Sequence, residues 1–481
     1  MSKTKRLICL SIVVAAAFGA MFLLGHNSRS LRTLRNYRAQ LRTRGEKLSY
    51  ADLIADRKDF TNHSLTTITN TIKRVVDGSA LTPGVLEMMR FTGPGQASVG
   101  WQADQPPLGS GRPWSWEEFA QEFEKVEPDL ESIRNALKDP SADMGVITNR
   151  YDWPRPFIAI RSTAHWLSGS ALYRLHQGNL EASLSNLEAI ASLAEVNRDD
   201  QTLVSQMIRI AVAGLGLSTS WEALQATNWT EPQLQRLQRA WQKVDLLAAV
   251  RAGVIGERCF GEDIFAEIRS DKISKVYSTF FSPSQPAGGL KRVDQYALIE
   301  LYRLTSINDD ELFYLQFTQG MVDSMRLLQT RSWADASESW ETHYTRLYNV
   351  ASSPQRFRYL FSLMAIPNYN KAFQTAVQNE TLRQLALVAI SLRRYELEHG
   401  GQPPSTLDLL VPKFLAAIPR DYFSTNSLRY RLVDNAPLFY SVGLDGHDDQ
   451  GDARPAQTGQ SPSLWVGRDI VWPRAAVNTN Q

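Results

Sequence analysis

The chain has 481 residues, of which 43% are hydrophobic and 21% are charged. These fractions are close to the average for globular proteins, which excludes a wholly disordered chain. The formal net charge is only +2. We therefore expect no nucleic-acid partner, because a dedicated nucleic-acid-binding domain needs a strongly basic face. The length allows two or three domains at roughly 100–200 residues each.

The two cysteines are Cys9, inside an apolar N-terminal segment, and Cys259. A structural disulfide between them is not expected, and a disulfide-dense fold is excluded. Two cysteines also exclude a cysteine-based zinc finger within one chain.

The first element in chain order is an uncharged segment, LICLSIVVAAAFGAMFLLG, from Leu7 to Gly25. A helix needs roughly 20 apolar residues to cross the hydrocarbon core, so residues 1–28 predict a short tail and a single transmembrane anchor. The alternative is a cleaved signal peptide, whose apolar stretch is roughly 7–15 residues long. Met21 to Leu24 continue the apolar run beyond the small residues of a possible cleavage site, which favours an uncleaved signal-anchor.

Basic residues lie on both sides of this anchor, and they leave its orientation open. Lys3, Lys5 and Arg6 precede it, and the arginines that follow it are Arg29, Arg32, Arg35, Arg38, Arg42 and Arg44. The positive-inside rule favours a cytoplasmic soluble domain, but large domains are translocated largely regardless of charge. Together with the C-terminal features below, this predicts an inner-membrane, single-pass protein with a periplasmic soluble domain.

Residues 29–113 are predicted to form a stalk and linker. The arginine-rich residues 29–48 are expected to form a solvated helix, or one that contacts the anionic head groups of the lipid bilayer. A second helix is expected within 49–78. Residues 92–113 are rich in Gly, Pro and Ser, which predicts a loop.

Residues 114–400 are predicted to form an α-helical domain, so the expected fold class is mainly α. Ser115 with two glutamates in the turn that follows it is typical of a helix start. From Pro156 to Leu247 apolar residues recur at helical spacing, interrupted by a turn at His176 to Asn179. This part is similar to one tetratricopeptide-type hairpin, without the regular repeat of about 34 residues, and predicts an array of α-helical hairpins.

One apolar run inside this domain, Ala211 to Leu217, is too short for a second membrane span. Because Arg209 and Glu222 flank it, we expect a buried core helix there.

Residues 401–481 are predicted to form a small antiparallel β module. Leu428 to Leu432 and Pro437 to Val442 have strand character, with Asp434-Asn435 as the turn between them. An acidic, Gly-rich loop follows, and Asp469 to Pro473 is expected to be a last short strand. The order of these elements resembles the C-terminal module of the major pseudopilins of type II secretion systems. The helical part and this module together also resemble a family of uncharacterised bacterial membrane-anchored proteins.

The resemblance implies a calcium-binding loop, with Asp445 and Asp469 as ligands. Arg468 stands where pseudopilins often have a second acidic residue. The side chains that could replace this missing ligand are Asp448, Asp449 and Asp452. The chain lacks the pseudopilin leader-peptidase site, so the resemblance does not imply filament assembly. The alternative is a solvated acidic turn.

No catalytic residues are predicted, because the chain contains no zinc-protease, Gly-x-Ser-x-Gly, P-loop or dinucleotide-binding motif. His165 is expected to be a structural histidine. Gly256 to Cys259 is expected to contain either a buried ion pair or a reactive thiol. We therefore predict a membrane-anchored, non-enzymatic scaffold or binding protein with a protein partner. The alternative is a membrane-tethered enzyme whose site combines residues such as Glu257, Arg258 and His165.

Overall fold

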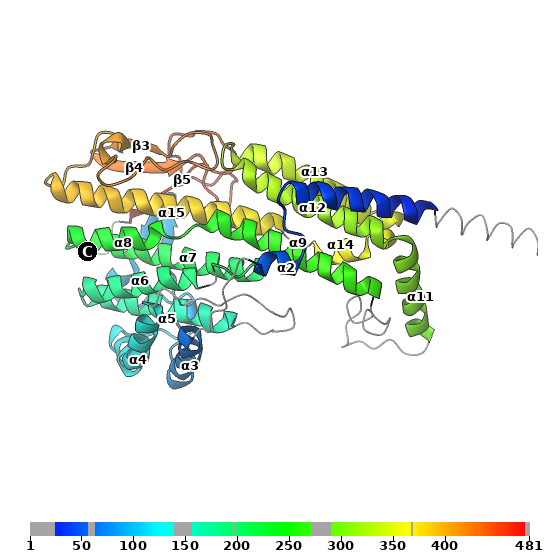
Figure 1. Ribbon diagram of the computed structural model, residues 1–481. Helices are drawn as coiled ribbons and strands as arrows, with labels where there is room; N and C mark the ends of the chain where they lie inside the picture. Colours follow the sequence, from blue (N-terminus) through cyan, green and yellow to red (C-terminus); the bar gives the residue numbers. More distant parts are fainter. Residues whose placement is uncertain are drawn as a thin grey trace, which may run out of the picture. The chain divides into compact units, whose positions relative to one another are not determined.

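The computed structural model describes residues 25–55, 63–138, 156–196, 198–270, 290–366 and 369–476 (Figure 1). It is mainly helical, with 64% helix and a small antiparallel sheet, which confirms the predicted fold class at this level. Of the predicted anchor, only Gly25 belongs to the described residues.

The chain divides into two compact units, and both are discontinuous in sequence. Unit 1 contains residues 1–57, 254–324 and 338–369, and unit 2 contains residues 58–253, 325–337 and 370–481. The predicted domain boundaries after residues 28, 113 and 400 stay predictions.

In its described residues, unit 1 is helical. Residues 25–43 form its first helix. The other elements that contribute to it are α2 (Tyr50–Ile54), α9 (Leu246–Ser270), α11 (Leu290–Thr305), α12 (Ile307–Leu327), α13 (Trp333–Ala351), η3 (Pro354–Arg358) and α14 (Leu360–Ala365). Unit 1 contains residues 254–270 of α9, 307–324 of α12 and 338–351 of α13, and the other residues of these helices belong to unit 2.

The helix at residues 25–43 packs against α12, where Leu34 and Leu41 form a buried cluster with Leu315. Arg38 of the same helix donates to Glu262 of α9 at 2.8 Å and pairs with the buried Glu311 of α12. The solvated stalk predicted for residues 29–48 is therefore a packed helix from residue 29 to residue 43. Leucines spaced seven residues apart give it an apolar side, and α12 covers that side.

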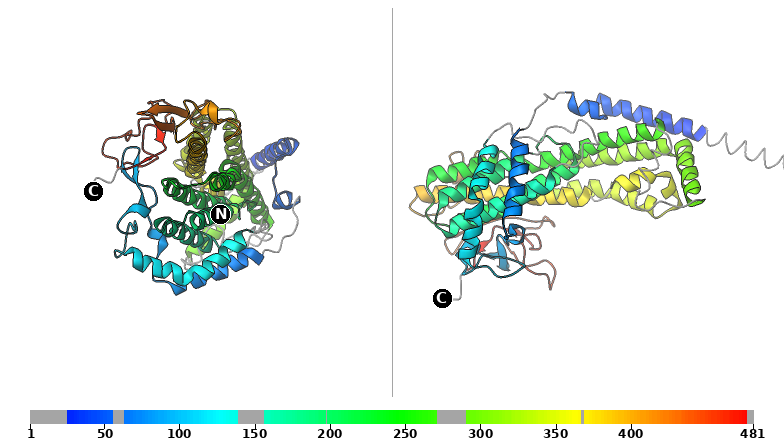
Figure 2. Two further views of the ribbon diagram at one scale, coloured as in Figure 1. Left: turned by 90° about the vertical axis from the view of Figure 1, so that its left-hand side faces the viewer. Right: turned by 90° about the horizontal axis from the view of Figure 1, so that it is seen from below.

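Unit 2 contains the remaining helices, which are α3 (His63–Gly78), η1 (Pro83–Val85), η2 (Gly100–Gln102), α4 (Trp116–Leu137), α5 (Phe157–His176), α6 (Leu180–Glu195), α7 (Leu203–Leu224), α8 (Glu231–Gln242), α15 (Tyr369–Glu398) and η4 (Leu407–Leu410). Helices α5, α6 and α7 pack on one another, and α8 packs on α6. Helices α3 and α4 form a further contacting pair beside α5 (Figures 1 and 2).

The turn between α5 and α6 lies where the sequence predicts it. Gly178 adopts a positive φ of 72°, and the side chain of Asn179 accepts the Ala182 N–H to cap α6. The predicted start of α4 is also confirmed, because Ser115 and Glu118 form a capping box.

Helix α7 is the one helix in the described part of the chain that is long and apolar enough to cross a membrane. Over half of its most apolar window, 56%, is buried inside the protein, so this is weak evidence for a span. A Cβ added at Gly216 would lie 2.6 Å from atoms of Ile190 and Trp241, which shows how closely α7 packs on its neighbours. These contacts agree with the predicted core helix.

The C-terminal sheet contains β3 (Arg429–Val433), β4 (Ala436–Ser441) and β5 (Ile470–Val471), all antiparallel in the order β3-β4-β5. Asp434 and Asn435 form the β3–β4 turn with φ values of 52° and 62°, as the sequence predicts.

A second small sheet contradicts the loop predicted for residues 92–113 over residues 92–98, whereas residues 103–113 are irregular as predicted. The strands β1 (Arg90–Gly93) and β2 (Gln96–Ser98) form a hairpin, and β2 pairs in parallel with β6 (Arg474–Ala475). Gly95, at a φ of 65°, permits the tight turn. The stabilising partner of this hairpin comes from the far end of the chain, so the local sequence does not reveal it.

Glu222 of α7 connects this hairpin region to the helical core. Its buried carboxylate accepts the Met89 N–H at 2.9 Å and the Gly100 N–H at 2.8 Å. Burial raises the pKa of Glu222 to about 7, and the two N–H donors oppose that rise.

We expect Glu222→Gln to remove a pH-dependent part of the stability. Because the pKa is higher in the folded than in the unfolded state, this group lowers the wild-type free energy of unfolding as pH rises from about 4.5 to about 7. At about 1.4 kcal/mol per pKa unit, the total is roughly 3 kcal/mol. The glutamine also leaves one N–H without an acceptor. Urea unfolding followed by circular dichroism between pH 4 and 8 measures the free energy of unfolding of both proteins. The variant should be less stable than the wild type at pH 4, and the difference between their free energies of unfolding should be smaller at pH 8. A gap independent of pH would contradict the assignment.

Candidate functional site

A groove of about 520 Å³ runs along α6 in unit 2, between the end of α4 and α8. We call it the basic groove. A second hollow of about 320 Å³ extends it and shares Leu137, Lys138, Glu188, Ser192 and Arg236 with it. The residues that line the basic groove are Leu137, Lys138, Glu188, Ala191, Ser192, Glu195, Arg198, Arg236, Arg239, Ala240 and Lys243.

The two carboxylates of the groove are already paired with arginines. Glu188 accepts two hydrogen bonds from Arg236, at 3.0 Å and 2.7 Å. Glu195 pairs with the buried Arg209, whose Nε also donates to the Ala194 carbonyl at 2.8 Å. These pairs neutralise the negative charge of the groove and hold α6, α7 and α8 together.

Among the described residues, Lys138, Arg239 and Lys243 of the groove have no carboxylate partner at hydrogen-bond distance, whereas Arg198 donates to the adjacent Asp199 at 3.5 Å. Lys138 donates to the Asn135 amide oxygen at 2.8 Å, and Arg239 makes one long bond of 3.4 Å to its own helix. Lys243 is exposed, and Arg198 lies 3.6 Å from Glu195. With the buried Leu137 and Ala191 beneath them, these side chains form a positively charged groove with a partly apolar floor. Such a groove can bind an anionic, partly apolar segment.

This groove was not predicted from the sequence. Arg236, Arg239 and Lys243 are spaced three and four residues apart, which puts them on one face of α8. That spacing is the sequence feature from which a basic face could have been predicted. It does not reveal which of these three positive charges is neutralised, because the partner Glu188 lies on another helix.

The acidic loop predicted to bind calcium folds around one of its own aspartates. The carboxylate of Asp469 accepts the N–H groups of Gly451 at 2.6 Å, Asp452 at 3.2 Å and Asp449 at 3.4 Å. Burial raises the pKa of Asp469 to about 6, against the effect of these donors.

The other candidate ligands have separate partners. Asp448 accepts from Tyr440 at 2.9 Å and from Arg429 at 3.0 Å. Asp452 pairs with Arg454, Asp445 accepts the His447 N–H, and Asp449 lies 3.8 Å from Arg468. No group of three or more His, Cys, Asp or Glu side chains in the described ranges is arranged to hold a metal ion. Calcium binding by this loop stays a prediction.

The residues considered for an enzyme site lie in different units. Arg258, in unit 1, is fully buried and donates to Glu46 at 3.0 Å and to the Lys47 carbonyl at 3.1 Å. This is the buried ion pair that the sequence analysis weighed against a reactive thiol. The neighbouring Cys259 is buried, which raises its pKa to about 12, so its thiol is not activated. The Glu257 carbonyl accepts the Tyr314 hydroxyl.

His165 belongs to unit 2 and is half-buried against Gly84. Burial, followed by the charge of Arg161, lowers its pKa and favours the neutral ring. Neither His165 nor Arg258 lines the basic groove.

No family model, no curated protein and no solved structure shows a significant match to the chain. The resemblance of residues 401–481 to the pseudopilin module therefore stays a prediction. Function has to be argued from the geometry of this chain.

We expect Asp469→Asn to destabilise unit 2 more than Asp445→Asn does. An asparagine at position 469 replaces an acceptor oxygen by an NH₂ group, which leaves at least one buried N–H unpaired and costs about 1–3 kcal/mol. Asp445 is exposed and accepts only one local N–H, so its substitution should cost less than about 1 kcal/mol. Thermal unfolding of the full chain in detergent measures both, and equal losses would contradict the role given to Asp469.

The same melting experiment with added calcium tests the predicted ion site. A calcium-dependent rise in the melting temperature that Asp469→Asn removes would support it. An unchanged melting temperature would show a hydrogen-bonded turn without a metal.

Proposed function

We propose that this protein is a membrane-anchored, non-enzymatic binding protein whose helical domain docks an acidic segment of a partner protein in the basic groove. The observation that supports this most directly is the charge of the groove. Its carboxylates are paired within the protein, while Lys138, Arg239 and Lys243 are available to a ligand. Packed helices fix the backbone positions of these cations, so binding has to order only their side chains.

A peptide fits this site better than a lipid surface does. The cations line a hollow of about 520 Å³ and lie on α4, on α8 and after α6. A flat bilayer touches protruding side chains, whereas an extended or helical segment can fill a groove. The apolar floor suits a segment that alternates acidic and apolar residues.

The proposal includes the N-terminal anchor and an inner-membrane location with the soluble part in the periplasm. Both rest on the uncharged residues 7–25 and on the size of the domain that follows. The anchor would confine the groove near the membrane and raise the local concentration of partners in the same compartment.

Reversing two cations of the groove should weaken peptide binding. We expect Arg239→Glu with Lys243→Glu to reduce, by roughly tenfold or more, the affinity for a fluorescent peptide of alternating glutamate and leucine residues. Fluorescence anisotropy with the full chain in nanodiscs measures this. Wild-type binding should weaken as salt is raised.

A matched control is Lys73→Glu with Arg90→Glu, which makes the same change in net charge at exposed positions outside the groove. This variant should bind like the wild type. Equal losses in both variants would indicate non-specific attraction and would overturn the proposed groove. Binding of anionic vesicles that needs Arg239 and Lys243, without peptide binding, would favour a lipid surface instead.

The anchor is tested by Val13→Asp with Val14→Asp. Each charge at the bilayer centre costs roughly 2.5–3.5 kcal/mol on insertion scales, so this variant should move from the membrane to the soluble fraction. Carbonate extraction followed by immunoblotting measures the distribution. A wild-type chain that is already soluble and shortened at its N-terminus would instead support signal-peptide cleavage.

A further inference from the structure

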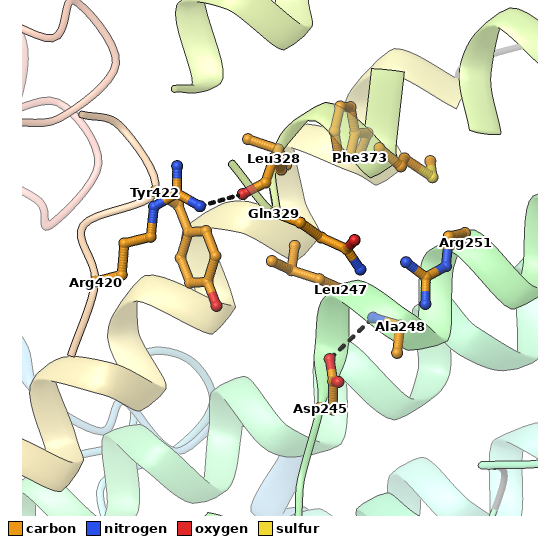
Figure 3. A pocket seen from close by; sticks show the side chains of 10 residues that line it. Asp245, Leu247, Ala248, Arg251, Leu328, Gln329, Phe373, Arg420 and Tyr422 are labelled. Carbon is orange, nitrogen blue, oxygen red and sulfur yellow. Dashed lines mark hydrogen bonds between the residues drawn. The ribbon is translucent and has the colours of Figure 1, made fainter. Parts of the chain in front are cut away.

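A separate cavity in unit 2 has a different character from the basic groove and shares no residue with it. It has a volume of about 290 Å³ and lies among the start of α9, the residues at the end of α12, α15 and the segment before β3 (Figure 3). Its lining residues are Asp245, Leu247, Ala248, Arg251, Met325, Leu328, Gln329, Phe373, Arg420 and Tyr422. We infer that this cavity binds a small monocarboxylate with an apolar body.

Three polar side chains of the cavity have donors to spare. Within the part of the chain that the structure describes, the guanidinium of Arg251, the amide of Gln329 and the hydroxyl of Tyr422 have no hydrogen-bond partner. Figure 3 shows the ends of Arg251 and Gln329 pointing toward the same part of the cavity, from α9 and from the residues after α12. A guanidinium beside an amide N–H is a favourable pair of donors for a carboxylate.

Two other charged residues of the cavity have structural roles. Asp245 accepts the Ala248 N–H at 2.9 Å near the start of α9, and Arg420 donates to the carbonyls of Leu328 and Arg331 at 2.7 Å and 2.6 Å. Arg420 thereby holds the wall that presents Gln329. The lining charges are one aspartate and two arginines, so their balance favours a ligand with a single negative charge.

The opposite requirement, an apolar surface, is also met. Leu247 and Ala248 are half-buried and give the cavity its exposed apolar surface. Phe373 and Leu328 are each only 1% exposed and Met325 is 5% exposed, so they form a fixed wall that contributes little exposed surface. The volume lies near the lower limit of typical ligand pockets, about 300 Å³. Burial raises the pKa of Tyr422 to about 12, so the hydroxyl remains a donor at neutral pH. A small aryl or branched alkyl carboxylate satisfies both sides of the cavity.

The test uses 3-phenylpropionate and its neutral amide as probes of the full chain in detergent, with binding followed by isothermal titration calorimetry. The carboxylate should bind saturably, and the amide at least tenfold more weakly. Arg251→Gln should weaken carboxylate binding by about tenfold or more and leave the amide unaffected. Arg331→Gln, an exposed arginine outside the cavity lining, should have no effect.

A second variant separates ligand binding from folding. Tyr422→Phe removes only a hydroxyl that has no partner among the described residues, so the melting temperature should not fall, while carboxylate affinity should drop about threefold to tenfold. Equal binding of acid and amide, or unchanged affinity in both Arg251→Gln and Tyr422→Phe, would overturn the inference. The absence of saturable binding up to about 10 mM would do so as well. These outcomes are independent of the proposed peptide binding in the basic groove, because that proposal is tested with a different ligand and different variants.

Discussion

The buried carboxylate of Glu222 is the contact on which the layout of unit 2 depends. It holds two N–H groups that precede it by 133 and 122 residues, those of Met89 and Gly100. In the same turn of α7, the Glu222 carbonyl accepts a hydrogen bond from the Trp101 indole N–H. The adjacent Trp221 donates its indole N–H to the Pro473 carbonyl. Helix α7 thus fixes the positions of both chain segments that form the β1-β2-β6 sheet.

Placing a carboxylate there has a thermodynamic cost. Its pKa rises to about 7 because two N–H donors do not fully replace water around a buried charge. An unpaired N–H at Met89 or Gly100 would also be costly in a buried position. The carboxylate satisfies both donors with one side chain, which an apolar residue at this position could not do.

Arginines also connect distant segments of the chain in the helices that form the basic groove. Arg236 connects α8 to α6 through Glu188, and Arg383 of α15 donates to the Trp241 carbonyl at the end of α8. Gln238 donates to the Phe414 carbonyl at 2.7 Å and so connects α8 to the C-terminal segment. These bonds hold α8 against its neighbours, and its exposed Arg239 lines the basic groove.

Unit 1 is held by buried charges as well. Asp310 accepts the Tyr302 hydroxyl at 2.7 Å and the N–H groups of Phe361 and Ser362, which joins α11, α12 and α14. Glu262, whose pKa burial raises to about 7, contacts Arg38 of the first helix. Removing one member of such a set would leave the other charge buried without compensation. The helix that follows the predicted anchor is therefore bound to unit 1 by polar contacts as well as by leucines.

The sequence by itself determined the features that depend on neighbouring residues. The cap at Ser115, the turn at Gly178, the buried character of α7 and the Asp434-Asn435 hairpin all follow from side chains within a few positions of one another. Periodicity and capping are local properties, so a single sequence contains them.

Only the tertiary structure decided how distant residues are paired. It showed that β2 pairs with β6, that Asp469 accepts N–H groups from its own loop, and that Glu188 neutralises Arg236 but leaves Lys243 available. It also brought Arg251, Gln329 and Tyr422 to one cavity. The chemical role of a charged side chain depends on which partner satisfies it, and in each of these cases the partner, or its absence, is set by packing between segments distant in the chain.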